Sequence, residues 1–157
     1  MAKFAEGTEV SVEKSRAEIE ALIIRYGATS TAFMNGPGRA LIMFEAKGRR
    51  IVFELPLPDA ADKKFERDGR GSCRTPERRM QAWEQACRQR WRALALVIKA
   101  KLEAVESGIT TFEDEFLAHI IMPDGMTVGA HIKPGIERAY ATNSMVPLLP
   151  APTRDVQ

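Results

Sequence analysis

The stretch PERRMQAWEQACRQRWRALALVIKAKLEAVE, residues 76–106, decides the fold, because it predicts one helix that is far longer than any other element. Thr75 is a suitable N-cap, Pro76 suits the first helical position, and Gly108 ends the helix. Large apolar side chains recur every three or four residues and form one seam: Met80, Trp83, Cys87, Trp91, Leu94, Ile98, Leu102 and Val105. We expect the two tryptophans to pack a sheet onto this helix.

Three short strands precede the long helix. Residues 29–34, 40–45 and 50–57 are rich in apolar and β-branched side chains, and the last of them alternates between two faces. Asn35-Gly36-Pro37-Gly38 and Lys47-Gly48-Arg49 supply tight turns between them. The pattern predicts an antiparallel three-stranded meander, and a sheet this small needs a helix packed on one face.

Shorter helices flank this pair of elements. Residues 11–26 show apolar side chains at helical spacing, and residues 110–122 predict another helix with acids in its first turn. Residues 126–132 read as an extended segment or a loop before Pro134, and residues 136–141 as a last helical turn or two.

The length of 157 residues fits one domain with tails. We expect a single α+β domain over residues 11–146, an N-terminal tail over 1–10 and a proline-containing tail over 147–157. Residues 59–75 are highly charged, with few large apolar side chains, which predicts a mobile loop inside the domain.

Positive charge is concentrated in the middle of the chain. Residues 63–101 contain twelve Lys or Arg and four Asp or Glu, a local net charge of +8, whereas the whole chain carries only +2. A one-sided field of this kind suits a polyanion such as DNA or RNA. The candidate phosphate-binding residues are Lys63, Lys64, Arg67, Arg70, Arg74, Arg78 and Arg79, with Arg49 and Arg50 as an extension and Phe65 and Trp83 as candidates for base stacking.

Catalytic patterns are weak in comparison. His119 and His131 fit no metal-binding spacing, and the acids at 113–115 point in different directions around a helix. The glycine-rich turn at 36–39 lacks the Lys-Ser/Thr of a phosphate-binding loop. We therefore expect no catalytic residue, no metal and no cofactor, and a protein that is not an enzyme.

The chain has no apolar run long enough to span a membrane and no apolar core of a signal peptide at its start. We expect no membrane partner and a cytoplasmic location. Cys73 and Cys87 have no second cysteine at metal-ligand spacing, and both are interpreted as plain thiols.

Three stretches carry a resemblance: SVEKSRAEIE (11–20), AWEQACRQRWRAL (82–94) and MPDGMTVG (122–129). They look like small proteins encoded by tailed phages and prophages, and the likeness covers most of residues 11–150. The resemblance implies a phage setting, in the cytoplasm of a bacterial host, and supplies no catalytic residue. The order helix, strand hairpins and long helix also resembles Whirly-type single-strand-binding folds.

Three functions follow as hypotheses. The leading one is a non-enzymatic, sequence-nonspecific nucleic-acid-binding protein, with single-stranded DNA as the favoured ligand. The second is a protein-interaction module, such as a host-factor inhibitor or counter-defence protein, in which the wide apolar seam of the long helix forms a homo-oligomer interface or the basic patch docks on an acidic host protein. The third is an enzyme, for example a nuclease, which metal-dependent cleavage of plasmid would support. The sequence leaves the preferred strand form and the oligomeric state open.

Overall fold

The structure is a computed structural model that describes residue 5, residues 7–145 and residues 147–149. Its elements are α1 (Val12–Arg25), β1 (Ala28–Gly36), β2 (Arg39–Ala46), β3 (Arg49–Pro56), η1 (Lys63–Phe65), α2 (Pro76–Glu106), α3 (Phe112–Phe116), η2 (Leu117–His119) and α4 (Val128–Thr142). The predicted α+β class is confirmed. Most of the proline-containing tail, and the first four residues of the predicted N-terminal tail, lie outside the described residues.

The three strands form one antiparallel sheet in the order β1-β2-β3. The first hairpin closes on the pair Gly36 and Arg39, around a two-residue turn at Pro37-Gly38. Gly38 takes a φ of +66°, which a glycine adopts without the strain that a Cβ would cause. The predicted three-stranded meander is therefore confirmed, with each strand within a few residues of its expected bounds.

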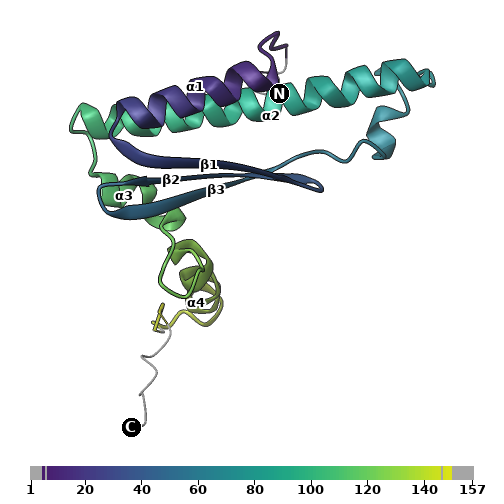
Figure 1. The fold of residues 1–157 in the computed structure, drawn as a ribbon. Coiled ribbons are helices and arrows are strands. Elements are labelled where there is room, and N and C mark those ends of the chain that lie inside the picture. The colour runs from purple at the N-terminus through teal and green to yellow at the C-terminus, as the bar shows by residue number, and fades with distance from the viewer. Residues whose placement is uncertain (1–4, 6, 146, 150–157) are drawn as a thin grey trace.

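Helices α1 and α2 lie side by side over one face of the sheet (Figure 1). Alternate strand residues point at the helices and are buried, and they share one apolar cluster with the facing sides of α1 and α2. Its largest members include Ile19, Ile23, Ile42, Phe44, Ile51, Phe53, Trp91, Ile98 and Phe116. From Cys87 onward the apolar seam of α2 is thus buried against other elements of the same chain.

Part of the outer edge of β3, residues 50–52, is covered by residues 119–121, at and just after the end of η2. Ile120 forms an antiparallel bridge with Ile51, and the Ile121 N–H donates to the Arg50 carbonyl at 2.8 Å. The Nδ1 atom of His119 lies 3.2 Å from the carbonyl oxygen of Val52. Residues 119–121 therefore satisfy backbone groups that an edge strand would otherwise leave to water.

The helix predicted over residues 110–122 was too long. It ends as α3 at Phe116, continues for one 3₁₀ turn as η2, and then becomes extended, because Ile120 pairs with β3 instead of continuing the helix. The side chain of Thr111 caps α3 as an acceptor for the Asp114 N–H.

The C-terminal region was also predicted wrongly, since residues 128–142 form one helix, α4, rather than an extended segment or loop followed by a last helical turn or two. The hydroxyl of Thr127 accepts a hydrogen bond from the Ala130 N–H and starts the helix. Pro134 lies inside α4, where a proline removes one helical hydrogen bond and normally breaks the helix.

Helix α2 begins and ends where the sequence predicted, with the Thr75 hydroxyl accepting from the Arg78 N–H at 3.3 Å. It is about 46 Å long at 1.5 Å per residue. Its N-terminal part extends past the end of α1 and past the sheet, beside the segment that carries η1 (Figure 1). We call residues 62–81 the basic arm.

Candidate nucleic-acid interface

The loop half of the basic arm has an internal hydrogen-bond framework. The Asp62 carboxylate caps η1 by accepting from the Lys64 N–H at 3.0 Å. The Asp68 carboxylate accepts from the backbone N–H groups of Arg70 and Ser72, each at 2.9 Å, and closes a tight turn. The segment was predicted as a mobile loop. Its acids Asp62 and Asp68 fix the loop backbone through these hydrogen bonds.

Arg74 lies inside this framework rather than on its surface. Its Nη1 atom donates to the backbone carbonyls of Arg67, Phe65 and Lys64 at 2.6, 3.3 and 3.5 Å. These bonds occupy Nη1 and leave only Nη2 and Nε of this guanidinium to reach a phosphate. Arg74 was predicted as a phosphate contact, and the structure gives it an internal role.

Phe65 and Lys64 are also engaged within the arm. Phe65 is only 6% exposed, so its ring offers little surface on which a base could stack. The Lys64 ammonium lies 4.9 Å from the centre of that ring and 2.8 Å from a carboxylate oxygen of Asp62. Burial of Phe65 anchors the loop, since it is the one large aromatic side chain that the loop contains.

Four cations of the arm remain open to solvent. Lys63, Arg70, Arg78 and Arg79 are exposed, and none of them pairs with a carboxylate within the described part of the chain. Arg67 is exposed as well, and donates to the Gly71 carbonyl at 3.0 Å.

Glu77, which stands next to Arg78 in the sequence, accepts hydrogen bonds at the start of α2. Hydrogen bonds from its own backbone N–H and from Thr75 hold the pKa of the Glu77 carboxyl below its usual value. The helix dipole also favours a negative charge in the first turn, so the Glu77 carboxylate contributes to the N-terminal cap of α2.

Arg49 and Arg50 are not part of this surface. They begin β3, whereas the arm follows the end of β3, so the length of the strand, about 25 Å at 3.3 Å per residue, separates the two places. Figure 1 shows the β2–β3 turn and the arm at opposite ends of the sheet. The fold therefore does not place Arg49 and Arg50 beside the basic arm, as the predicted extension of the basic patch required.

Two cations in the second half of α2, Arg92 and Lys101, pair with acids from elsewhere in the sequence, whereas Arg90 and Lys99 stay exposed. Arg92 pairs with Glu18 of α1, and Lys101 pairs with Glu115 of α3 at 2.8 Å. The local net charge of residues 63–101 therefore overstates the field along the helix. The four exposed cations of the arm have no such partners among the described residues.

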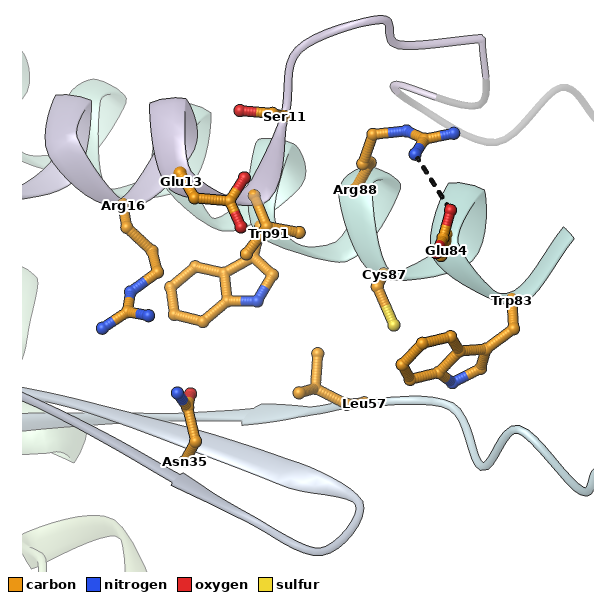
Figure 2. Close-up of a pocket in the computed structure, with 11 residues that line it drawn as sticks. Ser11, Glu13, Arg16, Asn35, Leu57, Trp83, Glu84, Cys87, Arg88 and Trp91 are labelled. Atoms are coloured by element: carbon orange, nitrogen blue, oxygen red, sulfur yellow. Dashed lines mark ion pairs between the residues drawn. The ribbon is translucent and has the colours of Figure 1, made fainter. Parts of the chain in front are cut away.

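A groove of about 470 Å³ runs from the base of the arm toward the N-terminus of α1 (Figure 2). Trp83 and Trp91 line one wall, and the Trp83 indole N–H donates to the Pro58 carbonyl at 2.8 Å. Trp83 is half-buried, so part of its ring faces the groove. This is the aromatic side chain that the fold places next to the exposed cations.

Arg16 is a groove residue that sequence reasoning did not single out. Its guanidinium lies 5.2 Å from the ring centre of Phe33 and 5.6 Å from that of Trp91, and no carboxylate among the described residues pairs with it. No local pattern in the sequence marks Arg16, because both rings come from other elements.

The groups with potential for chemistry are separated from one another. Burial raises the pKa of the Cys87 thiol, which favours the unreactive protonated form. His119 stacks on Phe53, whereas His131 lies 2.7 Å from Asp124. Within the described residues, no three His, Cys, Asp or Glu side chains gather as a metal site would require.

No family model matches the chain, and neither the curated proteins nor the solved structures contain a match. The resemblance to phage proteins and to Whirly-type folds stays a prediction from the sequence. None of the described helices has the length and apolar character that a membrane crossing requires.

Proposed function

We propose that the chain is a non-enzymatic nucleic-acid-binding protein that contacts phosphates through the basic arm, without reading base sequence. The observation that carries this proposal is a set of exposed cations to which the described part of the chain offers no carboxylate partner: Lys63, Arg70, Arg78 and Arg79. A Lys or Arg that neutralises a phosphate releases a condensed counterion, which favours binding at low salt.

The position of these cations supports a strand running along the arm. Arg79 and Trp83 are one helical turn apart on α2, so their side chains leave the same side of the helix. A phosphate at Arg79 would place an adjacent base near the half-buried indole of Trp83, at the entrance of the groove. A flexible single strand can follow this geometry more easily than a stacked duplex, and we therefore favour single-stranded DNA.

The test is a fluorescence-anisotropy titration of labelled single-stranded and duplex oligonucleotides at two salt concentrations. We expect tighter binding of single strands and a loss of affinity as salt rises. The double variant Arg78→Glu with Arg79→Glu should weaken binding at least tenfold and reduce the salt slope by about two phosphate contacts. Lys99→Glu is the matched control, since Lys99 is exposed on the same helix about 30 Å from Arg79.

Two results would reject the proposal. One is an absence of binding to either oligonucleotide at low salt, and the other is equal weakening by the arm variant and the Lys99 control. In the first case the same exposed cations would be tested against an acidic protein partner, which is the remaining use of an electrostatic surface.

A further inference from the structure

The two edge strands of the sheet, β1 and β3, differ in whether other described residues pair with them. Residues 119–121 cover the outer edge of β3 at residues 50–52, whereas no described residue pairs with the outer edge of β1. β1 spans nine residues, Ala28–Gly36, and its sequence ATSTAFMNG contains no charge and no proline. Natural sheets protect long edges with lysines, prolines or a covering segment, and an edge without them is a site for pairing with another strand.

The hairpin register shows which backbone groups of β1 are open. A two-residue turn requires Gly36 and Arg39 to be a hydrogen-bonded pair, and hydrogen-bonded pairs then alternate along the ladder. The backbone N–H and C=O groups of Thr31, Phe33 and Asn35 consequently point away from β2. These are the groups that an added strand would bond.

We propose that β1 pairs with β1 of a second copy of this chain, antiparallel about a two-fold axis at Ala32, so that two sheets join into one of six strands. About this axis Thr31 of one copy pairs with Phe33 of the other, and both are outward-facing residues. Ala32 meets its own symmetry mate through a small side chain. The same surface serves both subunits, as a two-fold interface requires.

Charges on α1 favour a second copy as the occupant. The Thr31 hydroxyl donates to the Glu20 carboxylate at 3.0 Å, so residue 20 of α1 lies beside residue 31 of β1. One strand residue spans about two helix residues, since the rises are about 3.3 and 1.5 Å. The two elements run in opposite directions (Figure 1), so Ala32 lies beside residue 18.

An axis at residue 18 relates residue 16 of one helix to residue 20 of the other. Arg16, which has no carboxylate partner among the described residues, would then lie next to Glu20 of the partner subunit, and this pair would occur twice. Ala17 lies on the exposed side of α1 and is small, which lets two helices pack at the 8–10 Å typical of helix pairs. The strand register permits an axis at Ala32, and the charges of α1 favour that axis.

The test measures the mass in solution of the full chain and of edge variants by light scattering. Wild type should have twice the 17.5 kDa of one chain. Thr31→Pro should be monomeric, because it deletes an outward N–H and none of the bonds to β2. Thr31→Val is the matched control: it loses the hydroxyl but keeps the N–H, and should remain a dimer.

A second variant covers the case in which Thr31→Pro does not fold by circular dichroism. Ala32→Lys adds a charge that is exposed in one chain but faces its own mate at the axis, so it should also give a monomer. Wild type that stays monomeric at roughly 100 μM, where even a weak interface is populated, would overturn the proposal. A dimer that persists in Thr31→Pro or in Ala32→Lys would overturn the edge as its interface.

Discussion

The Arg74 guanidinium donates a 2.6 Å hydrogen bond to the carbonyl oxygen of Arg67, so one arginine of the basic arm holds the backbone of another. Nearby, the Arg74 N–H donates to the Glu66 carbonyl at 2.8 Å, and Arg67 and Cys73 form an antiparallel bridge. The exposed cations of the arm are therefore carried by a loop whose backbone is held by another cation, Arg74.

Replacement of Arg74 should loosen the arm without unfolding the protein. In Arg74→Gln the carbonyls of Arg67 and Phe65 lose a charged donor, which is worth about 1.5–3 kcal/mol per hydrogen bond. We expect hydrogen exchange at the Asp68 and Gly71 amides to accelerate about tenfold or more, with little change in the core. Arg70→Gln is the control. Equal protection in both variants would contradict the internal role of Arg74.

Replacement of Ser15 by alanine should stabilise the protein. Ser15 is 0% exposed, and its hydroxyl is the one buried side-chain polar atom without a hydrogen-bond partner in the described part of the chain. An unsatisfied buried hydroxyl costs about 1–3 kcal/mol, and alanine is also the better helix former. Urea unfolding of Ser15→Ala should give a free energy of unfolding about 1 kcal/mol higher.

Ser11→Ala makes an informative comparison for that measurement. It removes the hydroxyl that accepts from the Lys14 N–H at the start of α1, and should lower the free energy of unfolding by about 1 kcal/mol. If Ser15→Ala also destabilised the protein, its hydroxyl would have a partner, such as a buried water.

Replacement of Gly129 by alanine should weaken the attachment of α4. A Cβ at position 129 would lie 2.8 Å from the Ala118 carbonyl oxygen, a backbone atom that cannot move without shifting η2. Glycine to alanine usually stabilises a helix by about 0.5–1 kcal/mol, but here we expect a loss of about 1–3 kcal/mol. Thermal unfolding should show the lower midpoint, whereas Ala130→Ser, at an exposed neighbouring position, should change it little. A higher midpoint for Gly129→Ala would contradict the close packing.

His119 should make the protein less stable in acid. Burial is the main cause that lowers the pKa of His119 below 6.5, so the unfolded chain binds the proton more readily than the folded one. The free energy of unfolding should therefore fall as the pH drops below about 6.5, the pKa of an unperturbed histidine. His119→Gln should show a smaller difference between pH 7 and pH 5 in urea titrations. An unchanged difference would assign the acid sensitivity to other groups.

Local signals in the sequence predicted the long helix and the meander, because caps, turns and alternation act between neighbours in the chain. Thr75, Pro76 and Gly38 each impose a conformation within a few residues. The break after Phe116 was missed because its cause is the pairing of Ile120 with β3, some seventy positions away along the chain. Tertiary contacts of that kind override helical periodicity.

The candidate site was predicted only in part for the same reason. Residue type and spacing placed a basic segment correctly between the sheet and the long helix, yet they could not assign partners to individual arginines. Arg92 meets Glu18 and Arg74 meets backbone carbonyls only after folding. The number of charges can therefore be read from the sequence, but which of them face solvent depends on contacts that form only in the folded chain.

The cover that Ile120 and Ile121 place on β3 has a consequence for how far assembly can proceed. A sheet with two bare edges can add copies without limit and grow into a fibre. Here residues 119–121 of the same chain occupy the β3 edge at residues 50–52. Pairing through β1 would therefore use the longer open edge of each copy and stop at two. Residues 120–121 thus limit the number of chains that the sheet can join. Deleting them should convert a dimer into an open-ended polymer.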